Sequence, residues 1–319
     1  MNCLVTGGAG FIGSNVVEAL LGRGDRVTVL DDLSSGRREN IAPFEGNERF
    51  GFVEGSVTDP DICNEACRGM EVVFHQAAFV NVHESIRNPV VTVESNVTGM
   101  VNVLEAAHRA GVRTVVCASS TSVYGNVASL PVVETMPPSP RSPYAASKAA
   151  GELFARAYNE MYGMHIVGLR YFNVYGERQD TSSHYAAVIP QFIVALLGGG
   201  QVTIFGDGEQ TRDFVHVSDV VRANLKASES SPGAGGQAYN IGTGTKTSVN
   251  ELYEILAAEI GSAQPPSFEP GLVGDVRDSV ADISKAREAF GYRPKMTLGE
   301  GLRQTIRWYR ERMHKGTVV

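Results

Sequence analysis

The sequence predicts an α/β fold in which a doubly wound parallel sheet is joined to a smaller C-terminal α/β portion. Two observations predict this fold: short apolar runs alternate with helical patterns in the first half of the chain, and the alternation loosens after about residue 175. Strands that alternate with helices form βαβ units, whose strands run parallel. A chain of 319 residues also exceeds one minimal core. We therefore expect one domain over 1–175 and a second portion over 176–319, partly interleaved with the first.

Apolar runs mark the expected strands, and amphipathic stretches mark the expected helices. In chain order the strands cover 2–7, 26–32, 50–55, 71–78, 113–120 and 165–173, with a short strand at Val202–Phe205. The clearest helices cover 11–24, 92–110, 144–162, 249–260 and 298–313. The stretch SPGAGG at 231–236 predicts a flexible turn, and the proline-rich stretch 262–271 predicts a connection.

Composition limits the possible functions. The net charge of −7 and the pI near 5.6 argue against nucleic-acid binding, which requires basic patches. The apolar runs are shorter than the roughly 18 residues that a membrane-spanning helix needs. Glycines interrupt the first apolar run, and this interruption argues against a cleavable signal peptide. The four cysteines suggest no disulfide framework, and Cys63 and Cys67 lack a nearby His or second Cys pair, so we expect no metal site. We therefore expect a cytoplasmic protein.

The stretch TGGAGFIGSN follows the first expected strand and opens the first expected helix. Its glycines Gly7, Gly10 and Gly13 form G-x-x-G-x-x-G, a variant of the dinucleotide fingerprint that lets backbone N–H groups approach a pyrophosphate. Asp31 ends the next expected strand, 18 residues after Gly13. A carboxylate at that place accepts hydrogen bonds from the adenosine ribose and repels a 2′-phosphate, which predicts NAD rather than NADP. Asp32 fits either the same site or a solvated strand end.

The stretch PYAASK places Tyr144 and Lys148 four residues apart, on one face of the expected helix. A cation about 5 Å from a phenol lowers its pKa of about 10 by about two units, and a second cation would bring it into working range. The oxidised nicotinamide ring is such a cation. A phenolate beside it can remove a hydroxyl proton, with Ser120 bonded to the reacting oxygen. The six residues alone favour an ordinary amphipathic helix, but together with the nucleotide motif they predict a catalytic pair.

These motifs together resemble the extended short-chain dehydrogenase/reductase family, and most closely its nucleotide-sugar 4-epimerases. The resemblance runs from TGGAGFIG to SVADISKAREAFGY, nearly the whole chain. It implies a Ser120–Tyr144–Lys148 catalytic set, with Asn96 steadying the active-site helix or a water near Lys148. It also implies an NAD-binding domain over 1–175 and a UDP-sugar-binding portion over 176–319. The implied cofactor-binding residues are Gly7, Gly10, Phe11, Ile12, Gly13, Asp31, Asp32, Ser35, Gly36, Ser56, Val57, Gln76, Ala77, Ala78, Asn96, Tyr144, Lys148 and Phe172.

The same resemblance implies how a UDP-sugar would be held. Arg212 in QTRDFVHV would clamp a phosphate, a role that suits a planar guanidinium. The alternative is a structural role as a partner of Asp213 or Asp219. Thr203 and Phe205 would hold the uracil. The implied substrate-binding residues are Ser120, Asn173 at the diphosphate, Val188 through its backbone, Thr203, Phe205, Arg212 and Ser279 beside the hexose.

Three positions depart from the family pattern. Ser56 replaces an aspartate that many relatives place near the adenine amino group. Leu272 stands where many relatives carry a phosphate-binding arginine two positions before Gly274, so Arg277 is a candidate substitute. Val80 replaces a polar or basic residue beside the substrate. These departures concern substrate choice rather than chemistry.

The predicted activity is NAD-dependent epimerisation at C4 of a UDP-hexose through a transient 4-keto sugar. The small Ser279 predicts room for an acetamido group, so that UDP-GlcNAc and UDP-GalNAc would be used beside UDP-glucose and UDP-galactose. The alternatives are a UDP-glucuronate 4-epimerase or decarboxylase and a nucleotide-sugar 4,6-dehydratase. A dehydratase needs an Asp-Glu pair after Ser120, where this chain has Thr121 and Ser122. A non-catalytic NAD-dependent regulator would not need Ser120, Tyr144 and Lys148.

The resemblance also implies a homodimer. Related proteins pair the helices near 92–110 and 144–162 across a two-fold axis. Burial inside the monomer would equally explain apolar positions on these helices. The apolar positions in question are Val97, Val101, Leu104, Leu153, Phe154, Ala157 and Met161.

Overall fold

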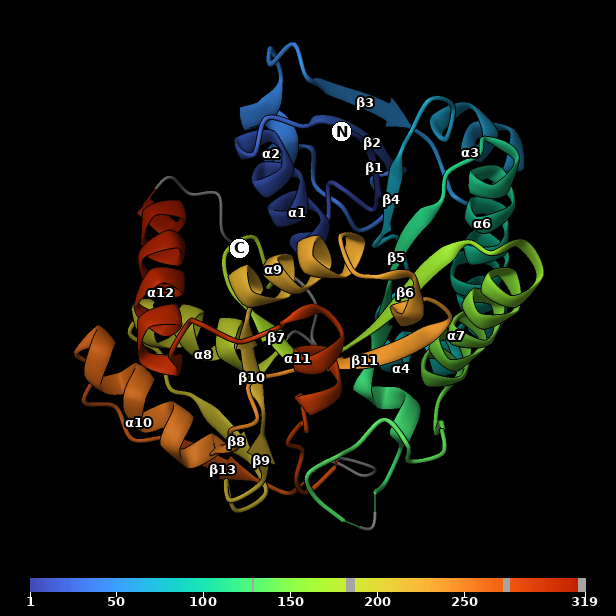
Figure 1. The fold of residues 1–319 in the computed structure, drawn as a ribbon. Helices are drawn as coiled ribbons and strands as arrows, with labels where there is room; N and C mark the ends of the chain where they lie inside the picture. Colours follow the sequence, from blue (N-terminus) through green and yellow to red (C-terminus); the bar gives the residue numbers. More distant parts are fainter. Residues whose placement is uncertain (128, 182–186, 272–275, 315–319) are drawn as a thin grey trace.

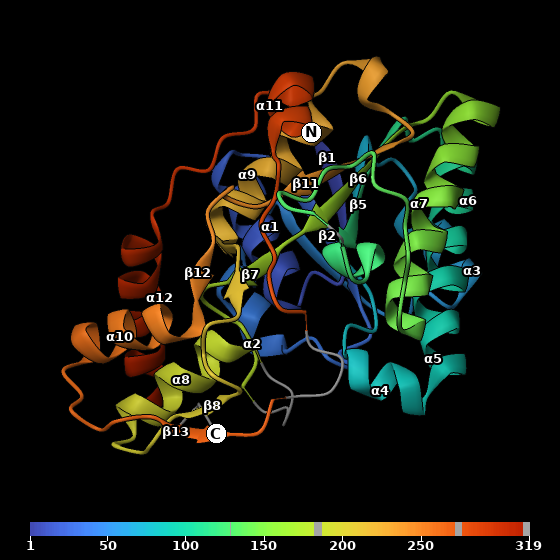
Figure 2. The same cartoon turned by 90° about the horizontal axis from the view of Figure 1, so that it is seen from below.

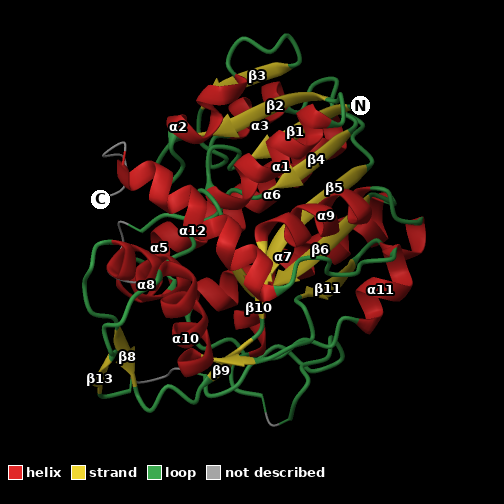
Figure 3. Ribbon diagram, turned by 90° about the vertical axis from the view of Figure 1, so that its left-hand side faces the viewer, coloured by secondary structure: helices red, strands yellow, loops and turns green. Residues whose placement is uncertain are grey.

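The computed structural model describes residues 1–127, 129–181, 187–271 and 276–314, and it is built on a seven-stranded parallel sheet. The strand order is β11-β6-β5-β4-β1-β2-β3, which Figure 3 shows as a row from β3 at one end to β11 at the other. The direction of chain progression therefore reverses between β1 and β4, the place where open α/β sheets bind ligands. The strands are β1 (Asn2–Thr6), β2 (Arg26–Asp31), β3 (Phe50–Glu54), β4 (Val72–His75), β5 (Thr114–Ser120), β6 (His165–Tyr171) and β11 (Gln237–Ile241). The predicted doubly wound sheet is confirmed.

Helices cover both faces of this sheet. One face packs against α1 (Phe11–Gly22) and α9 (Val217–Ser228), and the other against α3 (Pro60–Ala66), α6 (Gly99–Arg109) and α7 (Pro143–Tyr162) (Figure 1). Side chains alternate between the two cores along each strand. In β4, for example, Val72 and Phe74 join the core with α1, whereas Val73 joins the core with α6. Leu104 is fully buried in that second core, so it does not belong to an exposed dimer face.

The expected helix over 92–110 is interrupted. Its N-terminal part is α5 (Pro89–Val93), which follows α4 (Val82–Arg87), and a π-helical turn over Glu94–Thr98 then leads into α6. A π-turn widens the helix by one residue and is frequent at functional sites. Here it carries the buried Asn96.

The C-terminal portion has a core of its own, on the far side of the molecule from α6 and α7 (Figure 2). It combines α8 (Val188–Leu197), α10 (Val249–Ile260) and α12 (Leu298–His314) with β8 (Thr203–Phe205), and the helices expected near 249–260 and 298–313 are present. Three two-stranded sheets surround this core. They pair β7 (Asn173–Tyr175) with β10 (Phe214–His216), β9 (Thr211–Arg212) with β12 (Thr247–Ser248), and β8 with β13 (Ser267–Glu269).

The large sheet draws on residues beyond 175. Strand β11 pairs with β6 at the sheet edge, and α9 packs on α1. A short helical turn over Pro232–Ala234 precedes β11, within the stretch expected to be a flexible turn, and α11 (Ser284–Phe290) packs against β11. The division of function at residue 175 therefore stays a prediction. Among the described residues, no helix combines the length and apolar character that crossing a membrane requires.

Candidate active site

The glycine-rich turn after β1 is shaped by close backbone packing. Gly7 adopts a φ of +67°, and a Cβ atom there would lie 2.6 Å from the backbone nitrogen of Ala77. A Cβ atom on Gly13 would lie 2.0 Å from the carbonyl oxygen of Gly7. Both positions therefore require glycine. Gly10 is the N-cap of α1, so Phe11, Ile12 and Gly13 form the first turn, and no side chain caps this helix end.

Asp31 closes β2 beside this turn. Its carboxylate accepts hydrogen bonds from the backbone N–H groups of Ala9 and Leu33, each 2.9 Å long. Burial raises the pKa of Asp31, and the two backbone hydrogen bonds partly oppose that rise. The carboxylate is thus fixed at the carboxyl end of β2, next to the loop that contains Ser35 and Gly36.

Asp32 and Ser56 come together next to Asp31. Asp32 is exposed, and its carboxylate accepts a hydrogen bond of 2.5 Å from the Ser34 hydroxyl. Burial opposes ionisation of Asp32, but hydrogen bonds from Ser34 and Ser56 outweigh it and lower the pKa. The serine that departs from the family pattern therefore supports an ionised carboxylate at the expected adenosine end. Val57 follows it and is buried beneath.

The residues after β4 lie at the carboxyl end of that strand, which is separated from β2 by β1 in the sheet. Gln76 donates from Nε2 to Asn224 over 3.0 Å and accepts from the Tyr171 hydroxyl over 3.1 Å. Ala77 donates from its backbone N–H to the Thr6 hydroxyl. Ala78 continues this edge, and Phe172, 4% exposed, follows β6.

These groups fit a dinucleotide. The backbone cradle at Gly7 and Gly13 has no room for side chains, the amide groups at the start of α1 suit a pyrophosphate, and Asp31 offers a ribose acceptor. The predicted fingerprint residues thus lie together at the switch point between β1 and β4.

Tyr144 and Lys148 lie on the first turns of α7. The helix begins at Pro143 because Ser142 caps it, accepting a hydrogen bond of 3.1 Å from the backbone N–H of Ala145. Lys148 donates from Nζ to the carbonyl oxygen of Ala118 over 2.9 Å, and the same Nζ lies 5.9 Å from the centre of the Tyr144 ring. The helix therefore holds both side chains against the end of β5, where Ser120 is the last residue.

Burial has the largest effect on the pKa of both Tyr144 and Lys148. Burial raises the pKa of Tyr144, and a hydrogen bond with Ser120 acts in the opposite direction. Burial also lowers the pKa of Lys148 to about 8. In the chain alone burial outweighs the Ser120 hydrogen bond, and the lowering of the phenol pKa by Lys148 together with the nicotinamide stays a prediction. Ionisation of Tyr144 near neutral pH requires further positive charge in the site.

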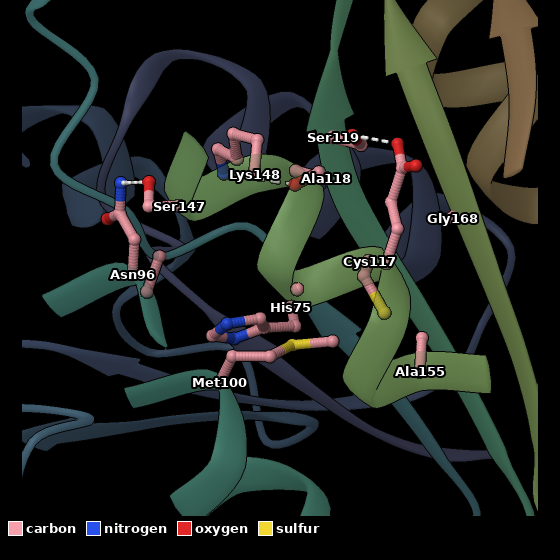
Figure 4. A pocket seen from close by; sticks show the side chains of 13 residues that line it. His75, Asn96, Met100, Cys117, Ala118, Ser119, Ser147, Lys148, Ala155 and Gly168 are labelled. Atoms are coloured by element: carbon pink, nitrogen blue, oxygen red, sulfur yellow. Dashed lines mark hydrogen bonds between the residues drawn. The ribbon is translucent and has the colours of Figure 1, made fainter. Parts of the chain in front are cut away.

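A small cavity of about 20 Å³ lies behind Lys148, between β4, β5 and the helices α6 and α7 (Figure 4). That volume is enough for about one water molecule. His75, Cys117 and Lys148 line it. Asn96 reaches it from the π-turn and donates to the Ser147 hydroxyl over 2.9 Å, while its Oδ1 accepts from the backbone N–H of Phe79. Asn96 thus binds the active-site helix directly.

Apart from Ser120 on β5, the expected substrate residues lie on β7, α8, β8 and β9 and on the segment that bonds to β9. Arg212 on β9 donates to the carbonyl oxygens of Thr211 and Arg277 over 2.9 and 3.4 Å. Ser279 donates from its backbone N–H to the Thr211 carbonyl over 3.1 Å, so Ser279 and Arg212 flank the same residue. Asn173 begins β7 and is exposed.

The remaining substrate residues lie further along this portion. Val188 is the first residue of α8. On β8, Thr203 shares a hydrogen bond of 3.2 Å with Ser267, and Phe205 is 37% exposed. These positions lie on α8 and β8, and their shared role in binding one ligand stays a prediction.

Two carboxylates suggested as alternative partners of Arg212 have other partners. Asp213 accepts hydrogen bonds from Thr243, Gly244 and Ala281. Asp219 pairs with Arg222. Both carboxylates are therefore bound by groups other than the Arg212 guanidinium.

Two residues connected with the departures from the family pattern, Arg277 and Val80, lie on the surface. Arg277 forms a bidentate ion pair with Asp207, over 2.8 and 3.0 Å, on the surface. Val80 is 61% exposed. Leu272 and Gly274 lie outside the described residues, so the substitution of Arg277 for a phosphate contact stays a prediction.

A network of hydrogen-bonded polar side chains next to the site was not predicted from the sequence. Arg170 on β6 pairs with Glu152 on α7, and its guanidinium also donates to the Tyr124 hydroxyl over 2.7 Å. Tyr124 in turn donates to Asn240 on β11. The sequence feature that could have indicated this network is the position of Glu152, one helical turn after Lys148.

Comparison with known proteins connects this geometry to a family. Residues 3–242 match the model of the NAD dependent epimerase/dehydratase family. The chain belongs to that family. Its cofactor is NAD, and the resemblance to extended short-chain dehydrogenases/reductases and their nucleotide-sugar epimerases is confirmed.

Individual members of the epimerase/dehydratase family are similar over their whole length. A UDP-glucose 4-epimerase of Mycolicibacterium smegmatis is 44% identical over 98% of this chain and 99% of that protein. The structure of a UDP-glucose 4-epimerase of Thermotoga maritima with UDP-glucose is 41% identical, with a TM-score of 0.92 over 98% of this chain and 100% of that one. A UDP-N-acetylglucosamine 4-epimerase of Methanobrevibacter ruminantium is 36% identical, with a TM-score of 0.93 over 98% and 99%. Relatives at 32–37% identity include dTDP-glucose 4,6-dehydratases and a UDP-glucuronic acid decarboxylase.

Proposed function

We propose that this enzyme interconverts the C4 epimers of UDP-hexoses. The observation that carries the proposal is the short helix Thr121–Tyr124, which follows Ser120 at the end of β5. It presents hydroxyl groups beside the Ser120–Tyr144–Lys148 set: Ser122 donates to the Ser120 hydroxyl over 3.0 Å. A 4,6-dehydratase needs an acid and a base there, and Thr121 and Ser122 supply neither.

In this proposal Tyr144, as phenolate, removes the proton of the sugar 4-OH and later returns it. Ser120 holds O4 by a hydrogen bond, and the Lys148 ammonium stabilises the phenolate. NAD, held by the Gly7–Gly13 turn and Asp31, supplies a reversible hydride acceptor when bound. Inversion requires that the 4-keto sugar turn over between the two proton transfers, so the chain must hold the hexose loosely.

Affinity therefore has to come from the nucleotide. We assign Arg212 and Asn173 to the diphosphate, Thr203 and Phe205 to the uracil, and the backbone at Val188 to the nucleotide. Binding energy from this non-reacting part keeps the intermediate in the site while the sugar turns. Ser279, whose backbone N–H donates to the Thr211 carbonyl, is the position we assign to the C2 substituent of the hexose. Its small side chain supports the use of acetamido sugars.

We also propose a homodimer. Leu153 and Met161 on α7 are 69% and 66% exposed, and Val90 on the adjoining α5 is 67% exposed. Large apolar side chains gathered on neighbouring helices are typical of a subunit interface. A second copy of the same face would cover them in an isologous contact.

A panel of sugar nucleotides tests the activity. UDP-glucose, UDP-galactose, UDP-GlcNAc, UDP-glucuronate and dTDP-glucose are each incubated with the purified protein without added reductant, and the products are resolved by NMR. The proposal expects C4 epimers of the UDP-hexoses. A 4-keto-6-deoxy product would instead indicate a dehydratase, and a pentose would indicate a decarboxylase. The same panel is incubated with Tyr144→Phe, which shows whether the formation of any product depends on the phenol.

A further inference from the structure

Both carboxylate oxygens of the largely buried Glu152 accept hydrogen bonds. Arg170 donates from Nε and Nη2 over 2.8 and 2.6 Å, and the Ser119 hydroxyl donates over 2.5 Å. The side chains of Arg170 and Glu152 are 7% and 12% exposed. A bidentate guanidinium–carboxylate pair of this kind has a defined geometry as well as a strong attraction. Glu152 is therefore held rigidly.

The partners of Glu152 are the elements that carry the catalytic set. Ser119 directly precedes Ser120 on β5, and the sheet register places Ser119 opposite Arg170 on β6. Lys148, one turn before Glu152 on α7, binds the neighbouring carbonyl of Ala118. Two successive residues of β5 thus bind two successive turns of α7 (Figure 4). The contact fixes the distance between Ser120 on the strand and Tyr144 on the helix.

Glu152 also places a carboxylate beside the cavity behind Lys148. Among the described residues that line the cavity behind Lys148, Glu152 is the one carboxylate. His75 faces it from β4, and burial together with the Lys148 charge lowers the pKa of His75 to about 3, so this ring is neutral. Cys117 faces it from β5, and burial raises its pKa to about 12, so it stays a thiol. The Tyr144 phenol carries no charge while it is protonated, and the Arg170 guanidinium on β6 is paired with Glu152.

Burial disfavours the ammonium form of Lys148, and Cys117 and then Glu152 act in the opposite direction. Because Cys117 stays a thiol, Glu152 is the one of these two groups that carries a charge near neutral pH. We propose that Glu152 is a positioning residue that holds the active-site helix on β5 and keeps Lys148 in its charged form. This inference rests on the role of Lys148 in the proposed function. A purely structural Glu152 would only neutralise Arg170, and its loss would leave the ionisation of Lys148 unchanged.

The pH profile of turnover separates these two roles. The variants are Glu152→Gln and, as a matched control, Glu160→Gln, which removes an exposed carboxylate of the same helix that pairs with Arg156. Turnover requires charged Lys148, so loss of Glu152 must move the alkaline limb of the kcat profile to lower pH. We expect a movement of about one pH unit, a tenfold lower kcat on the alkaline side, with KM unchanged. Glu160→Gln should leave the limb in place.

Two further variants guard against a folding defect, because Glu152→Gln leaves the Arg170 guanidinium unpaired. Glu152→Asp keeps the charge and should restore most of the wild-type profile. The double variant Glu152→Gln with Arg170→Met removes both charges and should still move the limb to lower pH. The proposal is overturned if the alkaline limb stays in place in Glu152→Gln or in the double variant. It is also overturned if the limb moves as far in Glu152→Asp as in Glu152→Gln.

A readout without turnover keeps this test separate from the proposed activity. The ionisation of the Lys148 ammonium can be followed by NMR of labelled lysine side chains, with Lys148→Ala providing the assignment. The transition should fall to lower pH in Glu152→Gln than in wild type, and unchanged titration contradicts the proposal. If wild type epimerises no UDP-hexose, the proposed function fails, while this titration still decides the effect of Glu152 on Lys148.

Discussion

Lys148 donates a hydrogen bond of 2.9 Å from Nζ to the carbonyl oxygen of Ala118. This contact anchors the ammonium to the end of β5, 5.9 Å from the centre of the Tyr144 ring. The position of the charge is therefore set by the strand as much as by the helix that carries the lysine. A fixed cation at this distance can assist ionisation of the phenol without forming a direct bond to it.

Lys148→Ala should lower turnover by roughly two to four orders of magnitude, the range typical of losing proper acid–base function. Any remaining activity should have its optimum at higher pH, because Tyr144 without the ammonium ionises at higher pH. Steady-state kinetics over a pH series measures both effects. Lys246→Ala, at an exposed position, is the control. An unchanged optimum together with near-normal turnover would rule out the electrostatic role.

His75 should make the fold sensitive to acid. Burial and then the Lys148 charge lower its pKa from 6.5 to about 3, so the folded chain resists a proton that the unfolded chain accepts below pH 6.5. Its contribution to stability is therefore lost as the pH falls from 6.5 towards 3. Between pH 6.5 and 5 the loss should be about 2 kcal/mol.

Urea unfolding of wild type and of His75→Gln at pH 7 and pH 5 measures this contribution as a difference between the two proteins. His108→Gln, at an exposed ring, is the matched control and should behave like wild type. Equal acid sensitivity of wild type and His75→Gln would show that His75 is not the group responsible.

The exposed apolar face of α7 should be a dimer interface. Leu153→Glu places a charge at a side chain that is 69% exposed in the monomer, so the fold should tolerate it while a buried contact between copies should not. Light scattering should give a dimer for wild type at micromolar concentration and a monomer for the variant. Phe268→Glu, at another exposed apolar side chain, should remain dimeric. A monomeric wild type would contradict the homodimer.

Ser279 should set the width of the sugar pocket. Ser279→Tyr should abolish conversion of UDP-GlcNAc and UDP-GalNAc by steric exclusion and spare UDP-glucose and UDP-galactose. Ser279→Ala keeps the space and should accept both pairs. The kcat/KM values for the four substrates decide the point. Wild type that ignores UDP-GlcNAc, or a tyrosine variant that loses both pairs equally, would show that another residue controls the pocket.

Much of the nucleotide-binding half could be predicted because its signals are local. Gly7 and Gly13 require glycine for backbone contacts formed within one turn and with the adjoining strand, and Asp31 follows its strand directly. The six strands expected in the first half all occur, with ends that differ by a few residues. β11 was not expected because QAYNI is a pentapeptide after a glycine-rich stretch, and it becomes a strand by pairing with β6.

The parts that could not be predicted depend on distant residues. The π-turn that directs Asn96 towards Ser147 has no separate signature within an apolar helical stretch. Glu152 and Arg170 are 18 residues apart, on a helix and on a strand, so only the fold shows that they pair. The raised pKa of Tyr144 likewise reflects burial, which the spacing of two side chains does not reveal.

The most direct test of the proposed chemistry follows an isotope at the reacting carbon. Purified protein is incubated with UDP-glucose that carries deuterium at C4, and the product is examined by NMR and mass spectrometry, with Tyr144→Phe as the control. Wild type should form UDP-galactose that retains deuterium at C4, and Tyr144→Phe should form less than about a tenth as much while still binding NAD and UDP. Deuterium found at C6 of a deoxy sugar, deuterium lost to water, or comparable turnover by Tyr144→Phe would contradict C4 epimerisation with Tyr144 as the base.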